Sequence, residues 1–582
     1  MATQALACGP NFLFGAHRRV IAHRMDDEDY RITSRFALEN PMLLGDAARL
    51  LKQVIIKANL RQAFRYAHRD RQKECFYDRF ELEWAEQNEK AIVDQLAEQL
   101  KDPLNYQLKP AFAYFTPKTE LCCRRMIYIP FEDLVVRYAF TTVIADLVDH
   151  DLSRKCFANR RDNNPDSGLF LQDFAKIAWP SFCKWQRDKR EEGKFPTLLR
   201  TDISAFYDAI SHKYLVDEIA GSLTVDPNSK LMKLFRHLLQ VPVLSYSHVE
   251  GNQREAETMH QGLCIGNATE GFLANLYLHH IDSDMDKIPE IEFGRYNDDM
   301  RIFAKDRPTA TRALLALQER LLTKGLNLNS SKTEFAPGQV EMEELRSKDY
   351  GDEEYSSDEE DAIVTRPVVS DKPFDEFTRN FEIGQDLANK GKDAKDFCHF
   401  LAKRITLSER QPGHVEMLHT ILTDWHGSAK HAAWRLVESF ARSECPKKTR
   451  ESAEAVLVKC LNNSNVTNYA KYRLLHYLVR PHKTRERYWK DLLSGNLRIL
   501  RNLLPTFLAE KAFELNIIAL YAMRCLGASA ADLKNAVEKH ACRPVPLPIK
   551  NALSLASTPK TPKRLPAFVP IGDEEGEMED NY

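Results

Sequence analysis

The 582-residue sequence lacks several features that would assign it to a particular class of protein. It contains no run of about eighteen apolar residues, so we expect no membrane span. The N-terminal stretch MATQALACGPNFLFGAHRRV has no basic start followed by an uninterrupted apolar block, which argues against a secretory signal. The twelve cysteines form no CxxC pair, and only Cys122 and Cys123 are adjacent. We therefore expect reduced thiols in a cytoplasmic protein, without disulfides or a zinc site.

The sequence also lacks the net positive charge that is common among nucleic-acid-binding proteins, because its net charge is −2. The charges are nevertheless segregated along the chain. Basic residues cluster in the first two hundred positions, in segments such as HRRVIAHR and RQAFRYAHRDRQK, and acidic residues concentrate at 341–361 and 573–580. Local basic surfaces decide whether phosphate is attracted, so a nucleic-acid partner is not excluded.

The composition, 43% apolar and 29% charged, is typical of a folded protein. A chain of 582 residues is too long for one hydrophobic core, so we expect about three or four domains. The sequence pattern predicts these parts: a helical region at 1–110, short strands with a long helix at 111–200, alternating helices and strands at 201–340, an acidic linker or insert at 341–373, an α-helical region at 374–542, and an extended tail at 543–582.

Residues 196 to about 338 follow the order β-α-α-β-β-α-β. A strand TLLRTDIS precedes helices that include GNATEGFLANLYLHHID, and EFGRYNDDMRIFA has the pattern of a β-hairpin. A helix ending at Gly325 and a strand LNLNSSKTEF complete the set. The order predicts a small sheet with helices packed against it. Amphipathic helical segments at 374–542 are compatible with a stacked helical repeat, although no clean period is found.

Three motifs in this region carry residues suited to phosphoryl transfer. They are TDISAFYDAI, with Asp202 at a strand end, HQGLCIGNATEGFLANLYL, in which a glycine-containing loop opens a helix, and YNDDM, with Asp298 and Asp299 in a hairpin turn. Transfer of a nucleotidyl group can use two divalent ions held by carboxylates from neighbouring strands. Magnesium prefers oxygen ligands and keeps several waters, so a few aspartates are sufficient.

These motifs resemble the catalytic palm motifs of reverse transcriptases, whose third motif is usually Tyr-x-Asp-Asp. TPKTELCCRRMIYIPFED is similar to the fingers segment of that family, and GLNLNSSKTEF to the segment after the palm hairpin. The similar region covers roughly residues 110–338. The resemblance implies an α+β fold with right-hand-like fingers (111–200) and palm (201–340), followed by a large all-α C-terminal domain.

The resemblance also implies roles for residues at the matching positions. Asp202 and Asp298 would ligate two Mg²⁺ ions, or Mn²⁺ in their place, and Asp299 would assist near the primer end. The carbonyl of Ile203 would complete the site of the ion on the nucleotide side. Lys332 would supply a proton or positive charge to the pyrophosphate.

A second set of residues would contact the incoming nucleotide. Lys118 and Arg125 would bind the triphosphate, and Arg124 is a rival for the same role, because adjacent arginines on a strand point in opposite directions. Gln261 and Gly262 would lie against the nucleotide, where glycine allows close approach of the backbone. Two further residues, Phe206 and Tyr207, lie at the strand–helix junction, and we expect Phe206 to be buried in the core and Tyr207 to face the sugar.

One subgroup of the family fits best. The phrases CFANRR and TDISAFYDAI and the helical C-terminal region look like bacterial abortive-infection and defence-associated reverse transcriptases. This resemblance implies antiphage defence, with dNTPs, an RNA template or non-coding RNA, and a DNA product as partners, and homo-oligomerisation as an option. Some members of the subgroup make DNA without a conventional template or start on a protein hydroxyl. No pattern of an RNase H, an endonuclease or a HEPN ribonuclease follows residue 338.

Two other functions compete with DNA synthesis. An RNA-dependent RNA polymerase uses the same palm geometry, and the residue that contacts the sugar, here Tyr207, distinguishes the two enzymes. A degenerate palm that acts as a nucleic-acid-binding scaffold would need no metal, so chelation separates it from both.

Overall fold

A computed structural model describes the chain in segments. The described residues are 45–76, 78–118, 122–164, 167–244, 256–336, 373–389, 407–425, 429–442, 444–479, 503–509, 512–525 and 528–540. The predicted linker at 341–373, apart from its last residue, and the predicted tail at 543–582 lie outside them.

The described part of the N-terminal region is helical. The stretch FELEWAEQNEKAIVDQLAEQL forms two helices that meet at Asn88. Helix α6 is buried along nearly its whole length and has two acidic residues in its first turn, where they complement the helix dipole. The helices up to this point are α2 (Ala47–Ile55), α3 (Lys57–Arg71), α4 (Arg79–Gln87), α5 (Glu89–Gln99) and α6 (Phe131–Val148).

The first of two four-stranded sheets has the strand order β2-β1-β4-β5. β1 (Ala111–Pro117) and β2 (Cys123–Tyr128) form an antiparallel hairpin, in which Phe115 lies opposite Arg125 and Thr116 opposite Arg124. The short strands β4 (Pro242–Leu244) and β5 (Glu257–Thr258) join its other edge. This sheet therefore combines strands from two regions that the sequence pattern separates, 111–200 and 201–340.

The second sheet has the order β6-β7-β3-β8 and contains the predicted hairpin. Its strands are β3 (Thr197–Thr201), β6 (Ile291–Tyr296), β7 (Asp299–Ala304) and β8 (Glu334–Phe335). The predicted closing strand LNLNSSKTEF is mostly not a strand, because only β8 pairs in the sheet and Ser330–Lys332 form a 3₁₀ turn. The backbone of Leu328 still forms an isolated bridge with that of Ile203.

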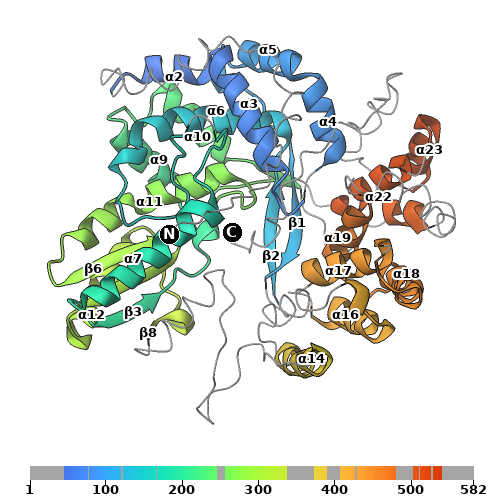
Figure 1. The fold of residues 1–582 in the computed structure, drawn as a ribbon. Coiled ribbons are helices and arrows are strands. Elements are labelled where there is room, and N and C mark those ends of the chain that lie inside the picture. Colours follow the sequence, from blue (N-terminus) through green and yellow to red (C-terminus); the bar gives the residue numbers. More distant parts are fainter. Residues whose placement is uncertain are drawn as a thin grey trace, which may run out of the picture.

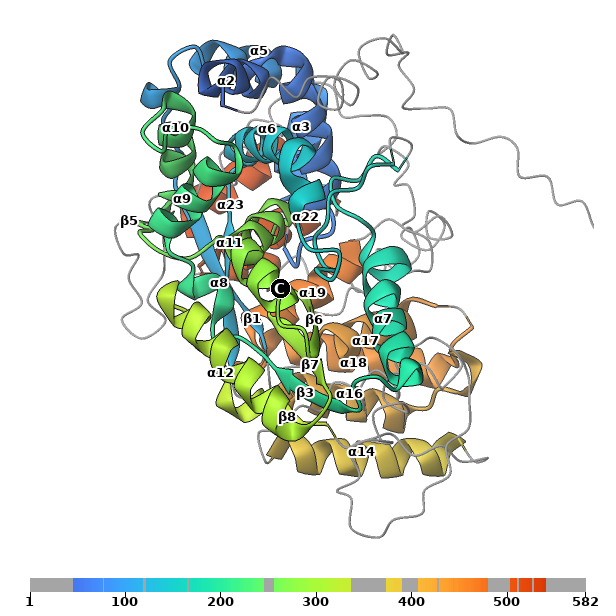
Figure 2. The ribbon, with the colours of Figure 1, turned by 90° about the vertical axis from the view of Figure 1, so that its left-hand side faces the viewer.

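Helices cover both faces of the second sheet. α11 (Ala268–Asp286) and α12 (Arg307–Thr323) pack on one face, and α7 (Trp179–Glu192) contacts β6 from the other, as Figure 2 shows for α12 and α7 on opposite sides of the strands. α12 begins at Asp306, whose side chain accepts a 2.8 Å hydrogen bond from the Thr309 amide, and ends before Gly325, which has a φ of +76°. The predicted end of this helix is therefore confirmed.

Three helices connect β3 to the next strands. They are α8 (Phe206–Ala209), α9 (His212–Ser222) and α10 (Lys230–Leu239). Each of the two longer helices is capped by a serine side chain at its N-terminus.

The C-terminal region is helical, as predicted. Its described α-helices are α14 (Pro373–Asn389), α16 (Pro412–Asp424), α17 (Ala429–Ala441), α18 (Lys447–Asn462), α19 (Asn468–Val479), α22 (Phe513–Cys525) and α23 (Ala530–His540). In Figure 1, β1 and β2 stand between the second sheet and the helices α16 to α23, which are coloured orange to red. The predicted α+β class, with a large helical C-terminal region, is confirmed.

Aromatic side chains attach the C-terminal helices to the rest of the chain. The ring of Tyr472 on α19 lies 5.2 Å edge-on from that of Phe76, and Tyr521 on α22 lies 5.2 Å from Phe80. Glu83 on α4 accepts hydrogen bonds from the Tyr521 hydroxyl (3.1 Å) and from Arg524 (2.9 Å). Aromatic contacts of this kind contribute about 0.5–1.5 kcal/mol each beyond the burial of their surface.

None of the helices within the described residues has the length and apolar content needed to cross a membrane.

Candidate active site

Asp202 follows the last residue of β3 and is held by groups from the chain around residue 330. Its backbone carbonyl accepts a 2.7 Å hydrogen bond from the Asn329 amide. The ammonium of Lys332 lies 2.8 Å from Oδ2, and the Asn329 side chain lies 3.3 Å from Oδ1. Ile203, the next residue, has a buried side chain. The structure therefore brings Asp202, Ile203 and Lys332 together at one end of the second sheet.

Asp298 and Asp299 lie at the tip of the β6–β7 hairpin. Tyr296 and Asp299 form the last cross-strand pair, so Asn297 and Asp298 are the two turn residues. Asn297 has a φ of 55°, a left-handed conformation that asparagine adopts more readily than most residues. Because β7 pairs with β3 and Met300 lies opposite Thr201, the turn is beside the end of β3 that leads to Asp202.

The Asp298 carboxyl is in an electrostatically unfavourable environment. Burial raises its pKa to about 6, and the nearby carboxylate of Asp202 adds to this effect. The charge of Lys332 acts in the opposite direction, and Asp299 raises the pKa further by a smaller amount. The pKa of Lys332 is itself raised: burial lowers it, but the hydrogen bond to Asp202 and the three carboxylates together outweigh that cost. A divalent cation would relieve this excess of negative charge.

Asp299 differs from Asp298 in its contacts. Both of its carboxylate oxygens accept hydrogen bonds from Arg301, through Nη1 and, at 2.9 Å, through Nη2. Within the described residues, no three or more His, Cys, Asp or Glu side chains form a group that could hold a metal ion. Two of the three carboxylates pair with basic side chains of the protein: Asp202 with Lys332, and Asp299 with Arg301. The site therefore offers the oxygen donors that Mg²⁺ prefers, although it is not a closed cage of ligands.

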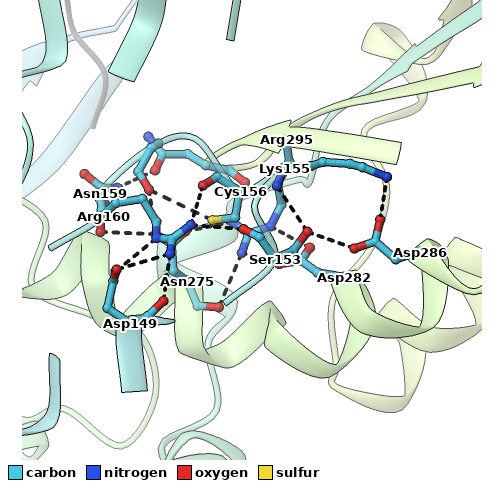
Figure 3. Close-up of polar contacts among 12 residues, drawn as sticks. Asp149, Ser153, Lys155, Cys156, Asn159, Arg160, Asn275, Asp282, Asp286 and Arg295 are labelled. Atoms are coloured by element: carbon cyan, nitrogen blue, oxygen red, sulfur yellow. Dashed lines mark hydrogen bonds and ion pairs between the residues drawn. The ribbon is translucent and has the colours of Figure 1, made fainter. Parts of the chain in front are cut away.

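A segment at 153–161 supports the hairpin from the open edge of β6. Cys156 forms a parallel bridge with Arg295, and the Phe157 amide donates a 3.1 Å hydrogen bond to the Arg295 carbonyl. Figure 3 shows the side chains around this bridge. The Asn159 side chain donates to that of Asn297 in the turn, and the Asn275 side chain on α11 donates to the Ala158 carbonyl at 2.7 Å. This segment thus fixes the backbone of the turn that carries Asp298.

Buried charges anchor the same network. Arg295 is 1% exposed and donates to both carboxylate oxygens of Asp282 at 2.8 Å, and to Asn275 (Figure 3). Arg160 makes a similar two-pronged contact with Asp149 and donates to three backbone carbonyls. Removing one partner of a fully buried ion pair commonly costs about 3–5 kcal/mol, so we expect the position of the hairpin to depend on Arg295.

Tyr207, predicted to face the sugar, and Phe206, predicted to lie in the core, belong to a short helix that packs against the predicted glycine loop. Tyr207 and Phe206 on α8 are both buried, with their rings 5.4 Å apart. The Leu263 amide donates to the Tyr207 carbonyl at 2.9 Å, and the Gln261 side chain lies 3.3 Å from the Asp208 carbonyl. Gly262 has a φ of +84°, and a Cβ there would lie 3.1 Å from that same carbonyl. Glycine is thus required by the approach of the α8 backbone.

The fingers residues lie on the β1–β2 hairpin. Lys118 and Arg125 are exposed and Arg124 is half-buried. Burial raises the pKa of Tyr207 and that of the Cys264 thiol, and the charge of Arg124 offsets part of the first rise while that of Arg125 offsets part of the second. Arg124 therefore lies nearer to the first motif, which contains Tyr207, and Arg125 lies near Cys264 of the second.

Some residues of the site were not predicted from the sequence. The contact between Arg301 and Asp299 could have been predicted, because residues two positions apart on a strand lie on the same face. Asn159, Asn275 and Asp282 gave no such signal, since their contacts with the hairpin join residues far apart in the sequence.

The second sheet is palm-like, and its end carries both Asp202 and the hairpin turn with Asp298. The family described as "Reverse transcriptase (RNA-dependent DNA polymerase)" matches residues 165–346, which include Asp202, the glycine loop and the hairpin. Residues 165–346 are thus similar to a reverse transcriptase domain, a type of nucleotidyltransferase. No curated protein matches the chain in sequence.

Solved structures with a similar fold include two of telomerase. An apo telomerase from Candida Tropicalis truncated from its C-terminal domain is 15% identical over 40% of this chain and 52% of its own, with a TM-score of 0.29. The apo telomerase from Candida Tropicalis is 12% identical over 72% of this chain and 69% of its own, with a TM-score of 0.30. The chain spans about half the length of the first of these. Both scores are too low to indicate a function.

Proposed function

We propose that this chain is a DNA polymerase that copies RNA or works without a template, and that its polymerisation site is the end of the second sheet. The observation that carries the proposal is the proximity of Asp202, after β3, to Asp298 in the adjacent hairpin turn. Two acidic side chains held close together in a largely buried setting oppose folding, and a polymerase has a use for them because nucleotidyl transfer needs concentrated negative charge to hold cations.

Polymerases of this family generally use divalent metal ions. Asp202 and Asp298, with the carbonyl of Ile203, would hold two Mg²⁺ ions, and Asp299 would assist beside the primer end. When bound, such ions supply activation of the attacking hydroxyl and neutralisation of the phosphates. Lys332, which stays protonated beside Asp202, would provide positive charge where pyrophosphate leaves.

The direct test is incubation of the purified protein with each labelled dNTP and Mg²⁺, with and without co-purified RNA. The product is then treated with protease and with nucleases. Incorporation that requires RNA supports templated synthesis, incorporation without RNA supports synthesis without a template, and a product that protease shortens supports a start on a protein hydroxyl. No incorporation of any dNTP under all conditions would contradict the proposal and favour the scaffold alternative.

The triphosphate would be bound by Lys118 and Arg125, with Arg124 as the rival. The sequence places Arg125 at the position that matches the family's triphosphate arginine, five residues before Pro130. A guanidinium offers two parallel donors to phosphate, and such charge-assisted contacts are the stronger kind. Gln261 and Gly262, next to α8, would lie under the incoming nucleotide.

We expect Arg125→Ala to lower kcat/KM for dNTPs more than Arg124→Ala does. The two variants lose the same group from adjacent positions of one strand, so each is the matched control of the other. Steady-state kinetics with a single dNTP, together with the unfolding temperature of each variant, provide the measurement. Equal losses, or a greater loss in Arg124→Ala, would mean that the strand presents Arg124 to the triphosphate.

We further propose a division of the chain into fingers at 111–200, a palm at 201–340 and a helical domain at 374–542, joined by a linker at 341–373. Strands β4 and β5 belong to the palm by this division but complete the fingers sheet. The phrases CFANRR and TDISAFYDAI favour a role in bacterial antiphage defence, in the cytoplasm, with a non-coding RNA and a homo-oligomer among the partners to test.

We expect the helical domain to be required for defence, because it contains a run of amphipathic helices and packs on Phe76 and Phe80 of the N-terminal region and on β1 of the fingers. Deletion of 374–542 should abolish phage protection and alter the oligomeric state or retention of the product. Because the deletion also uncovers Phe76 and Phe80, Glu83→Ala is the milder variant, with Glu86→Ala on the same helix as the control. Unchanged protection, assembly and polymerisation in the deletion would refute this role.

A further inference from the structure

The two adjacent aspartates of the hairpin face different surroundings. Along β7 the side chains of Asp299, Arg301 and Phe303 share one face, which is the face covered by α7. The ring of Trp185 on α7 lies 5.4 Å from that of Phe303, and its indole lies directly over Gly294. Asp298, in contrast, feels the charges of Asp202 and Lys332. The strand therefore directs the Asp299 carboxylate toward α7.

Arg301 is built into the same surface. Its Nε donates a 3.1 Å hydrogen bond to Gln186 on α7, and its guanidinium lies 5.6 Å from the centre of the Phe182 ring. Its Nη atoms form the two-pronged contact with Asp299. Only 11% of the Arg301 side chain is exposed, against 38% of that of Asp299. An arginine held in this way by three groups has little freedom to turn away from Asp299.

The pairing also has an electrostatic reason within the sheet. Arg301 lies directly opposite Arg200 on β3. Like charges at opposed positions of an antiparallel pair destabilise a sheet, and the charge of Asp299 offsets this repulsion. The Asp299 charge is thus already balanced by a cation of the protein.

We propose that Arg301 is a positioning residue that holds the carboxylate of Asp299 toward α7 and limits how much of its charge reaches the ion site. This inference rests on the proposed function, because it assumes that Asp202 and Asp298 hold divalent ions. Arg301 then makes the two aspartates of the hairpin unequal: Asp298 is the principal ligand, and Asp299 is a restrained neighbour. The residue would set the affinity for divalent ions rather than contact the nucleotide.

The test measures the affinity of the full-length protein for Mn²⁺ in the absence of nucleotide, with electron paramagnetic resonance to detect the bound ion. Arg301→Gln releases Asp299 and should tighten Mn²⁺ binding by roughly tenfold, a change as large as the smaller losses caused by mutating partners of metal ligands, but of opposite sign because Arg301 competes with the ion for the carboxylate. In an Asp299→Asn background the same substitution should change the affinity less than about twofold, because there is no carboxylate to release. Arg301→Lys keeps the charge but loses the fork, so it should give a smaller tightening, and it serves as the second variant if Arg301→Gln does not fold.

Three results would overturn the inference. Weaker Mn²⁺ binding by Arg301→Gln would show that Arg301 orients Asp299 as a ligand. Unchanged binding would show that the pair is only structural. Equal tightening with and without Asp299 would show that the effect is a general loss of positive charge. Asp202→Asn separates these outcomes from failure of the proposed function: if that variant binds Mn²⁺ as the parent does, the ion site itself is wrongly placed.

Discussion

Asp298→Asn is expected to abolish DNA synthesis and to leave the fold intact. The substitution preserves the shape of the side chain but removes the charge that would bind the ions, and an amide oxygen is a poor replacement for a bridging carboxylate. Changes to the outer partners of metal ligands already cost about 10–100-fold, so loss of a ligand should lower the rate by on the order of a hundredfold or more. Incorporation of a labelled dNTP is the measurement.

The same substitution should not destabilise the protein when metal is absent. Burial and Asp202 raise the pKa of the Asp298 carboxyl to about 6, so its ionised form opposes folding. This cost is fully present above pH 6 and disappears as the pH falls toward 4, the usual range of an aspartate. With a chelator present at neutral pH, Asp298→Asn should therefore unfold at the same temperature as the parent or higher. The difference should shrink on acidification.

Asp306→Asn is the matched control for this experiment. Asp306 lies just beyond the other end of β7, where it caps α12, and asparagine caps helices about as well as aspartate. The control should retain both synthesis and stability. A folded Asp298→Asn protein that still incorporates dNTPs at about a tenth of the parent rate or better would remove Asp298 from the ion site.

The parts of the site that the sequence predicts are those set by local pattern. The alternation of EFGRYNDDMRIFA and the asparagine in its turn are local signals, and the hairpin forms where they indicate. The position of Asp202 at the end of a leucine-rich strand is likewise a local property, although β3 ends at Thr201, three residues before the end of the predicted strand TLLRTDIS. Lys332 reaches Asp202 although its segment is a 3₁₀ turn rather than the predicted strand, because Asn329 still pairs with the Asp202 backbone.

The parts that could not be predicted depend on contacts between distant segments. β4 and β5 have three and two residues, too short for a periodic signal, and β4 pairs with a strand that lies far earlier in the chain. Asn159 supports the hairpin turn across an even wider gap than the one between β1 and β4. Gly262 was predicted as a glycine that permits close approach, but the backbone that approaches it is that of α8.

Tyr207 is the residue that we propose selects deoxyribonucleotides over ribonucleotides. Its side chain is buried, and its hydroxyl has no hydrogen-bond partner among the described residues. Burial raises the pKa of Tyr207, and the charges of Asp298 and then Glu270 raise it further, which indicates that the phenol lies near the proposed ion site. Phe206 is also buried, in the same hydrophobic core. Burial does not distinguish the two rings, and the proximity of the phenol to Asp298 is the reason for proposing Tyr207, and not Phe206, beneath the sugar.

Tyr207→Ala is expected to admit ribonucleotides while reducing dNTP incorporation only moderately. In a close-packed site the phenol ring would collide with a 2′-hydroxyl, and overpacking of this kind typically costs about 1–3 kcal/mol or more. Since about 1.4 kcal/mol corresponds to tenfold, the parent should prefer dNTPs by roughly ten- to a hundredfold, and the variant should lose most of that preference. The measurement is the ratio of kcat/KM for a dNTP and the matching rNTP.

Two neighbouring variants make this prediction specific to the ring of Tyr207. Tyr207→Phe removes only a buried hydroxyl that has no partner among the described residues, so it should keep the sugar preference and be neutral or slightly stabilising. Phe206→Ala removes an aromatic ring of similar burial and should cost about 3–5 kcal/mol of stability without changing the ratio. A parent enzyme that uses both sugars equally would favour the RNA-polymerase alternative, because the ring would then exclude nothing. A ratio that falls in Phe206→Ala but not in Tyr207→Ala would instead reverse the roles of the two rings.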